Sequence, residues 1–498
     1  MQDPKITKAE RDGGGWDDEI EPPIKDVKLR KHQRKAFRLA MENGGTYGFL
    51  HEMGCGKTLT AISVMGTLHQ QCGVNKVLVV CPMAVYSAWV NDMERLDVPG
   101  VDPKIIKGTA ANKAKQLKYW RGKLQVAIIN YESFWRKDVA EAIAKWNPDM
   151  VILDEAHKIK AWNTSQSKGA HKLGDITPHK LLLTGTPIAN SPLDAWSQYR
   201  FLDKTVYGTS WYAFKNTYAV IEKKPLRGGG SYPKLLGYRN MESFKEKLHS
   251  IAHKVSKEEC LDLPEAIDIY RDVELEREAR DVYDGVAREM IAEIEDGVIT
   301  ASNVLVKSLK LSRITGGYCD VEKEGATELK QVSKAKINAL VEVLDELGPD
   351  KKICIFARFT AEINAIHELL LKRYAAEQIV TMTGSTPADE RLGNIDKFQT
   401  DGGCKVFLAN IQCAGLGITL TASDTMIFYS FGYSMTDYEQ AKARIHRIGQ
   451  KNACTYIHLI VTNSIDNTVR EAVERKKNVA EEILKYVKGG IENDKQTA

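Results

Sequence analysis

The chain has 498 residues, of which 43% are hydrophobic, 27% charged and 8% aromatic, with 15 prolines. This composition is typical of globular proteins and excludes collagen-like, low-complexity and wholly disordered chains. At roughly 150 residues per domain, the length predicts about three domains' worth of polypeptide. The net charge of +4 neither requires nor excludes a nucleic-acid partner.

Nine cysteines, without a C-x-x-C pair, predict reduced thiols and argue against a disulfide framework or a zinc site. No run approaches the ~18 consecutive apolar residues of a membrane helix, and residues 1–23 lack the apolar core of a secretory signal. We therefore expect neither secretion nor a membrane partner. The expected location is the cytoplasm or nucleoid in a bacterial or viral source, and the nucleus in a eukaryote.

Residues 1–26 carry charges, a run of three glycines and two adjacent prolines, which predicts a flexible N-terminal tail. Over residues 27–203, short apolar runs alternate with helical patterns. The predicted strands are TYGFL, KVLVVCP, LQVAIINY, DMVILDEAH and KLLLTGTP. Runs of about four to eight apolar residues bounded by polar, Gly or Pro signals are typical of buried parallel strands. The alternation predicts an α/β lobe with a doubly wound parallel sheet.

Residues 204–333 do not show this alternation of short apolar runs and helical patterns. A charge-rich pattern over residues 265–294 predicts a long amphipathic helix. We expect a helical insertion and an inter-lobe linker here. The alternation resumes over residues 334–475, which predicts a second α/β lobe in tandem with the first. Its predicted strands are KICIFAR, IVTMTG, CKVFLANI, DTMIFYS and TYIHLI. Residues 476–498 are polar and predict a C-terminal tail.

The segment HEMGCGKT, residues 51–58, lies between a predicted strand and a predicted helix, as a phosphate-binding loop requires. Gly54 and Gly56 allow backbone N–H groups to close around phosphates at a helix N-terminus. Lys57 can reach the β and γ phosphates, and Thr58 offers a hydroxyl to Mg²⁺. The strict pattern has glycine where this chain has His51. The motif predicts an ATP site, against the alternative of an incidental Gly-Lys-Thr turn.

Two carboxylates follow the strand predicted in DMVILDEAH. Asp154 and Glu155 stand at its C-terminal end, the edge at which parallel α/β sheets bind ligands. Asp154 is a candidate Mg²⁺ ligand, usually through water, and Glu155 is a candidate to orient the attacking water. Such a pair alone is more often a solvated edge, but downstream of a Gly-Lys-Thr loop it predicts catalysis.

Arg444 and Arg447 lie three residues apart in QAKARIHRIGQ, residues 440–450. On a helix they share one face and can present two guanidinium groups to a γ-phosphate. A basic helix that is merely solvated, or that binds a nucleic-acid backbone, explains the spacing equally well.

In order and separation these segments resemble the Snf-type superfamily-two helicase-like ATPases, which are double-stranded DNA translocases. The resemblance covers residues 29–461 and includes LRKHQRKAF, VLVVCPMAVYSAW, IINYES, LLLTGTPIANS and FLANIQCAGLGITLTASDTMIFY. It implies two RecA-like lobes around a cleft that holds ATP and Mg²⁺, with duplex DNA lying across both lobes. The chain departs from the family pattern at Thr419, where asparagine is common.

The resemblance also implies roles for single residues. Gln33 lies in the segment similar to the adenine-reading motif, and Met53 and Cys55 join the loop glycines in contacting nucleotide. Gly417 lies in a motif that contacts nucleotide and DNA, and Gln440 opens the arginine-finger motif. The segment from Thr184 to Thr186 is implied to couple the ATP site to DNA, and ARIHRIGQ is implied to supply the arginine finger.

Movement along a duplex needs contacts that ignore base sequence, so we expect loop residues after the lobe strands to hold phosphates. The candidate DNA contacts are Pro82, Thr186, Thr383, Ser385 and Arg391.

The sequence therefore predicts an ATP-hydrolysing motor that translocates on DNA, most directly duplex. Two alternatives stay open. A strand-separating DNA or RNA helicase would need a wedge element, and a nucleotide-gated DNA-binding scaffold would show no phosphate release.

Overall fold

The computed structural model describes residues 21–25, 28–188, 191–225, 231–256, 259, 263–295, 301–323, 326–416, 418–447 and 449–474. The predicted C-terminal tail and most of the predicted N-terminal tail lie outside these ranges. The chain divides into two compact units at the boundary between Leu261 and Asp262. We call the N-terminal one unit 1 and the C-terminal one unit 2.

Unit 1 is built on a seven-stranded sheet in which paired strands run parallel. In spatial order its strands are β3 (Val101–Ile105), β4 (Leu124–Ile129), β2 (Lys76–Val80), β5 (Met150–Asp154), β6 (His179–Leu183), β1 (Tyr47–His51) and β9 (Ala252–Val255). Within β2, Val77 and Val79 belong to one core, and Leu78 and Val80 belong to the other. Both faces are buried, which explains why these strands appear in the sequence as unbroken apolar runs.

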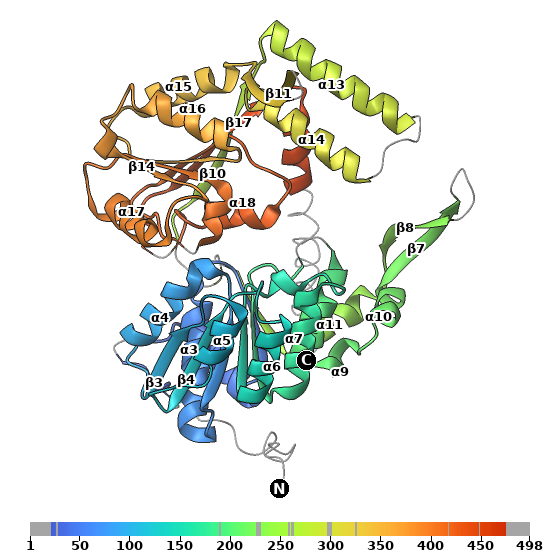
Figure 1. Cartoon of the computed structure of the whole chain (residues 1–498), viewed down its shortest axis with the longest axis vertical. Coiled ribbons are helices and arrows are strands. Elements are labelled where there is room, and N and C mark those ends of the chain that lie inside the picture. Colours follow the sequence, from blue (N-terminus) through green and yellow to red (C-terminus); the bar gives the residue numbers. More distant parts are fainter. Residues whose placement is uncertain are drawn as a thin grey trace, which may run out of the picture. The chain divides into compact units, whose positions relative to one another are not determined.

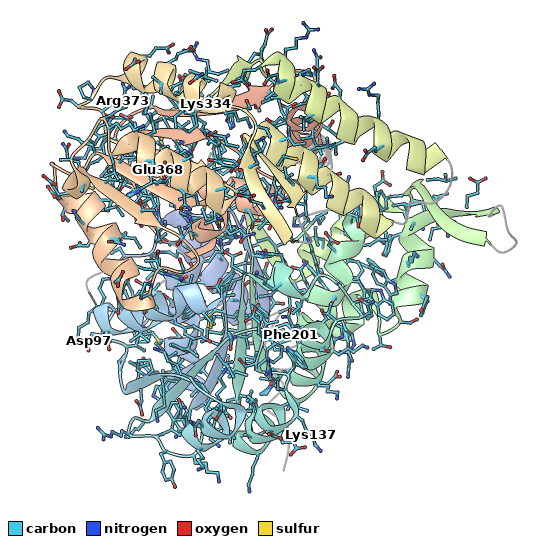
Figure 2. All side chains as sticks on the ribbon, turned by 45° about the horizontal axis from the view of Figure 1, so that its top comes forward. Asp97, Lys137, Phe201, Lys334, Glu368 and Arg373 are labelled. Atoms are coloured by element: carbon cyan, nitrogen blue, oxygen red, sulfur yellow. The ribbon has the colours of Figure 1, made fainter. Side chains whose placement is uncertain are left out.

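Helices cover both faces of this sheet (Figure 1). One core includes side chains of α2 (Lys31–Glu42), α3 (Lys57–Cys72) and α4 (Tyr86–Arg95). The other includes side chains of α6 (Lys137–Trp146), α7 (Ser165–Ile176), α8 (Ala195–Leu202), α10 (Trp211–Tyr218) and α11 (Met241–Ser250). The shorter elements are α5 (Ala110–Gln116), α9 (Lys204–Tyr207), η1 (Met83–Val85), η2 (Ala156–Ile159) and η3 (Pro192–Asp194). Figure 2 shows side chains filling the interior around the buried Phe201, whereas Lys137 lies at the periphery.

Unit 2 repeats the plan with a six-stranded sheet, again with parallel pairing. In spatial order its strands are β10 (Ala266–Val273), β17 (Cys454–Val461), β16 (Thr425–Phe428), β13 (Ile353–Ala357), β15 (Val406–Asn410) and β14 (Ile379–Met382). Within β13, Cys354 and Phe356 belong to one core, and Ile353 and Ile355 belong to another. The two sheets confirm the predicted class of tandem doubly wound α/β lobes.

The helices of unit 2 also divide between two faces. One core includes side chains of α15 (Ala335–Leu347) and α16 (Thr360–Leu370), and the other includes side chains of α17 (Ala388–Thr400) and α18 (Met435–Lys442). The remaining elements are α13 (Arg277–Glu295), α14 (Ala301–Thr315), η4 (Ala376–Gln378), η5 (Ile411–Leu416) and the antiparallel hairpin of β11 (Tyr318–Lys323) and β12 (Ala326–Gln331).

The stretch expected as helical insertion and linker contains strands as well as helices. In unit 1, β7 (Ala219–Pro225) and β8 (Ser231–Tyr238) form an antiparallel hairpin that extends away from the sheet (Figure 1). The predicted helix over residues 265–294 is wrong for its first part, because β10 occupies it and α13 begins only at Arg277. In β10, Ile267 and Ile269 alternate with Asp268 and Tyr270, a two-residue period that the surrounding charges concealed.

In the described part of the chain, no helix combines the length and the apolar character needed to span a membrane.

Candidate nucleotide site and arginine motif

The phosphate loop follows β1 and ends in the first turn of α3. Gly54 and Gly56 both have positive φ, of 89° and 76°, a conformation that favours glycine. Lys57 is buried, and its Nζ donates hydrogen bonds to the carbonyl oxygens of His51 (2.9 Å) and Glu52 (3.3 Å). These acceptors are neutral carbonyl groups, and Lys57 is the first residue of the 16-residue helix α3, at its positive end.

Helix α2 contacts the loop through two side chains. His32 Nε2 is 2.9 Å from the carbonyl oxygen of Cys55, and Gln33 Nε2 donates to the carbonyl oxygen of Gly56 (3.3 Å). Gln33 is buried, and its Oε1 accepts a hydrogen bond from the N–H of Arg30 (2.9 Å). Gln33, which the resemblance implies reads adenine, therefore contacts the phosphate loop directly. The sequence did not indicate the contact from His32.

The two acidic residues lie where the sequence predicts, at the end of β5. Asp154 is buried, and its Oδ2 accepts from the indole N–H of Trp89 (2.9 Å) and its Oδ1 from the N–H of Glu155 (3.0 Å). Burial, reinforced by the Glu155 carboxylate, raises the pKa of Asp154 to about 6, against the opposing effects of Trp89 and Lys57. Glu155 has a positive φ of 54°, which turns the chain sharply out of the strand. Its Oε2 lies 3.3 Å from Nδ1 of His157.

The order of the sheet brings these segments to one edge. Strand β6 lies between β5 and β1, and the three are parallel, so the residues after their C-terminal ends are neighbours. After β6, the buried Thr184 hydroxyl accepts a hydrogen bond from the N–H of Thr186 (3.2 Å). A Cβ on Gly185 would lie 3.3 Å from the carbonyl oxygen of His51, so this turn packs closely on the phosphate loop. Pro82 follows β2, on the other side of β5, at the same edge.

The groups at this edge suit ATP with its magnesium ion. Carboxylate and hydroxyl oxygens are the ligands that Mg²⁺ prefers, and Asp154 and Thr58 offer one of each. The raised pKa of Asp154 means that its protein surroundings stabilise its negative charge poorly, and a divalent cation bound here would supply positive charge. Lys57 and the N-terminal amides of α3, with Met53 and Cys55 in the preceding loop, would be the matching donors for a phosphate.

The two arginines of unit 2 lie in the turn after α18 and not on the helix. The prediction that they share a helix face is wrong, because the helix ends at Lys442 and the carbonyl of Arg444 accepts from the N–H of Leu420 (2.9 Å). They nevertheless converge, since both guanidinium groups donate to the carbonyl oxygen of Ile418, at 3.3 Å and 3.1 Å. Arg444 is buried, whereas Arg447 is partly exposed.

The two glutamines at the ends of residues 440–450 also contact this region, whereas Gly417 is predicted for a separate motif. Gln440 is buried on α18, and its main-chain carbonyl accepts a hydrogen bond from Nε of Arg444 (2.9 Å). Gln450, at the end of the motif, donates from Nε2 to the carbonyl oxygen of Ser423 (2.8 Å). Gly417 lies outside the described residues.

Three candidate DNA contacts of unit 2 come together around the loop after β14. The hydroxyl oxygens of Thr383 and Ser385 are 2.8 Å apart. Arg391, on α17, donates from Nε to the carbonyl oxygen of Thr386 (2.8 Å) and from Nη2 to that of Gly384 (3.1 Å). Arg391 therefore holds the loop in shape, and Ser385 lies exposed on it.

Two aromatic residues at the acidic end of β5 were not singled out by the sequence. Trp89, fully buried on α4, donates to the Asp154 carboxylate, and the Tyr131 hydroxyl donates to the main-chain carbonyl of Asp154 (2.8 Å). Both lie in segments that resemble family motifs, but no spacing links them to the carboxylate. Contacts between a helix and the end of a distant strand depend on tertiary packing, which periodicity does not encode.

Comparison with known proteins identifies the family of this chain. Residues 32–316 match the family model of the SNF2-related domain, and residues 335–449 match that of the helicase conserved C-terminal domain. The chain is 26% identical to the chromatin structure-remodeling complex protein SYD of Arabidopsis thaliana, over 92% of this chain and 13% of that protein. It is 28% identical to the uncharacterized ATP-dependent helicase MG018 of Mycoplasma genitalium, over 92% of this chain and 42% of that protein.

A third relative, the DNA annealing helicase and endonuclease ZRANB3 of Mus musculus, is 24% identical over 91% of this chain and 40% of that protein. The chain thus spans less than half the length of these curated relatives. The solved structure of the Sulfolobus solfataricus SWI2/SNF2 ATPase core in complex with dsDNA is 24% identical, covers 92% of this chain and 93% of that chain, and has a TM-score of 0.44. Because the first family model matches more than half of the sequence, the chain belongs to the SNF2-related domain family and carries a helicase conserved C-terminal domain.

Proposed function

We propose that this chain hydrolyses ATP and uses the reaction to move along duplex DNA. The observation that carries the proposal is the edge of the first sheet, where the Lys57 loop, the Thr184–Thr186 turn and Asp154 follow three adjacent parallel strands. Membership of the SNF2-related domain family supports it. So do the names of relatives, which include chromatin remodelling and DNA annealing.

Each residue at this edge has a separate role in the proposed hydrolysis. Lys57 and the loop amides bind the β and γ phosphates, while Thr58 and Asp154 hold the magnesium ion. When bound, the ion neutralises the negative charge of the phosphate oxygens. Glu155, directed by its left-handed backbone, accepts a hydrogen bond from water and orients it for attack.

Unit 2 contributes positive charge and part of the DNA contact. Arg444 and Arg447, which converge on one carbonyl oxygen, stabilise the transferring phosphoryl group in this proposal. Phosphates of the duplex are held by residues that follow strands of both units. Their hydroxyl and main-chain groups recognise the DNA backbone without reading bases, as a translocating motor requires.

Replacement of Lys57 by Ala tests the site. It removes the charge that binds phosphate, so we expect steady-state ATP hydrolysis to fall by roughly 10²-fold or more, with duplex binding largely retained. Lys137→Ala, an exposed lysine at the start of α6, is the matched control and should leave hydrolysis unchanged. Unimpaired turnover in the Lys57 variant would falsify the assignment of the loop.

The choice of nucleic acid is tested by ATP hydrolysis with no nucleic acid, duplex DNA, single-stranded DNA and RNA, each at two salt concentrations. We expect duplex DNA to stimulate hydrolysis most, and the stimulation to weaken with salt because phosphate contacts displace counterions. Stronger stimulation by single strands or RNA would instead favour a strand-separating helicase. Tight DNA binding with no phosphate release would favour a nucleotide-gated scaffold.

A further inference from the structure

A charged cluster includes Lys442 of the arginine motif of unit 2. We define the Asp268 cluster as Asp268 on β10, Tyr438 and Lys442 on α18, and His458 on β17. Lys442 Nζ donates to both carboxylate oxygens of Asp268, at 2.8 Å and 2.7 Å. His458 Nε2 lies 2.9 Å from Oδ1, and the Tyr438 hydroxyl lies 3.3 Å from the same oxygen. Groups from a helix and a neighbouring strand therefore converge on one carboxylate of β10.

Aromatic rings pack against the histidine of the cluster. His458 is fully buried, and its ring stacks between Phe428 (centroids 4.9 Å apart) and Tyr270 (4.8 Å). Although burial opposes ionisation, the His458 and Lys442 contacts hold the pKa of Asp268 well below its usual range. The pair of Asp268 and Lys442 is a partly buried, charge-assisted contact with two hydrogen bonds.

This cluster is joined directly to the turn that carries the arginines. Lys442 is the last residue of α18, and its carbonyl oxygen accepts from the hydroxyl of Tyr456 (3.0 Å) and from the N–H of His446 (3.2 Å). The imidazole of His446 lies 2.8 Å from the carbonyl oxygen of Pro264, just before β10. The chain around β10 therefore contacts the motif on both sides of Arg444.

We propose that Asp268 is a positioning residue for hydrolysis, which holds Lys442 and thereby the turn that aims Arg444 and Arg447. The proposal rests on the proposed function, because it concerns the efficiency of the same arginines. Asp268 acts through Lys442, so its loss should lower turnover and leave the affinity for ATP, which the phosphate loop provides, nearly unchanged. A purely structural role would instead lower the amount of folded protein and leave its turnover intact.

Asp268→Asn keeps the shape of the side chain and removes its charge. We expect kcat for duplex-stimulated ATP hydrolysis to fall by roughly tenfold or more, because small misplacements of catalytic groups are costly. The KM for ATP should change by less than about twofold, since the variant leaves uniform substrate binding intact. Arg271→Gln is the matched control, because Arg271 lies on the same strand and pairs with Glu346 outside the cluster. It should leave kcat unchanged.

Two variants of Lys442, the residue that pairs with Asp268, keep the test decisive if Asp268→Asn does not fold. Lys442→Gln should lose turnover as Asp268→Asn does, and Lys442→Arg, which keeps the charge and can donate two hydrogen bonds to a carboxylate, should retain most of it. Where both single variants fold, the double variant should be no worse than either, as expected for residues that act as one unit. Wild-type kcat in Lys442→Gln, or equal losses in Lys442→Gln and Lys442→Arg, would overturn the proposal.

Hydrogen exchange separates this inference from the proposed function, because it needs no hydrolysis. Amides of residues 443–447 should exchange faster in Asp268→Asn and Lys442→Gln by roughly tenfold or more, because breaking a partly buried, hydrogen-bonded ion pair weakens local structure. Arg271→Gln should leave them unchanged. Unaltered exchange overturns the positioning role whatever the activity. A wild-type protein that does not hydrolyse ATP, with the expected change in exchange, would instead refute only the proposed function.

Discussion

His51 illustrates how a departure from a motif is accommodated at the level of one residue. It occupies the position of the first glycine of the strict phosphate-loop pattern, yet it is the last residue of β1, where the backbone is extended. Its ring stacks on Phe49 (centroids 5.4 Å apart), and its Nε2 lies 3.3 Å from Nδ1 of His253 on β9. The side chain is buried in the sheet, and only its carbonyl oxygen contacts Lys57. Glycine is therefore not required at this position.

The burial of His51 predicts a pH dependence of stability. Burial, with smaller effects of His253 and Lys57, lowers the pKa of His51 from 6.5 to about 2. Between these values the unfolded chain binds a proton that the folded chain does not, so stability is complete above pH 6.5 and falls as the pH drops below it. For one group the slope approaches about 1.4 kcal/mol per pH unit. His51→Gln should flatten this decline, as measured by denaturant unfolding between pH 7.5 and 4.5.

Part of the acid sensitivity should remain in that variant. Burial also lowers the pKa of His171 and of His253 to about 4, so both resist protonation over the upper part of the same range. An unchanged slope in His51→Gln would mean that His51 is protonated in the folded protein.

At the scale of elements, the phosphate loop depends on its contact with α2. Gly56 has a φ of 76°, and a Cβ at this position would stand 2.1 Å from Nε2 of Gln33. Gly73, which ends α3, has a φ of 70° and nothing within 4 Å of its Cβ position. The two glycines thus share a backbone conformation and differ in their surroundings. Their comparison separates backbone strain from displacement of the loop.

We expect Gly56→Ala and Gly73→Ala each to lose about 1–2 kcal/mol of stability, the cost of a left-handed backbone for a residue with a Cβ. Only Gly56→Ala should weaken ATP binding, by roughly tenfold or more, because either the loop or the Gln33 amide that holds it must move. Thermal unfolding and nucleotide titration measure the two effects. Gln33→Ala in the Gly56→Ala background should relieve the clash in part. Equal ATP affinity in the two glycine variants would show that the α2 contact does not set the loop.

At the scale of the whole molecule, each unit has its own sheet and its own cores. Ile152 is fully buried in β5 of unit 1, and Ile355 is fully buried in β13 of unit 2. Chains with separate cores depart from two-state unfolding, because each core can melt at its own temperature. The boundary near Leu261 predicts this behaviour for the present chain.

Calorimetry should therefore resolve two unfolding transitions. Ile152→Val and Ile355→Val should each cost about 1 kcal/mol, which lowers one Tm by about 2–4 °C and leaves the other in place. The transition moved by Ile152→Val should also be the one raised by added nucleotide, because the phosphate loop belongs to unit 1. A single transition that both variants shift would contradict independent units.

The sequence alone determined the class of fold, the family and the position of the phosphate loop and carboxylates. Local order encodes these features, because a strand, a Gly-Lys-Thr turn and a helix follow one another directly in the chain. Buried parallel strands also appear as unbroken apolar runs, since helices cover both faces of each sheet.

The tertiary structure decided the rest, because it depends on contacts between residues far apart in the chain. Trp89 reaches the carboxylate of Asp154, and Lys442 reaches Asp268, across separations that no periodicity marks. The first part of the helix expected at residues 265–294 is instead β10, because pairing with β17 outweighs local helical preference. Arg444 and Arg447 lie beyond the end of α18, where the carbonyl of Arg444 accepts a hydrogen bond from the N–H of Leu420. Hydrogen bonds and burial of this kind are settled only when the sheet and its helices assemble.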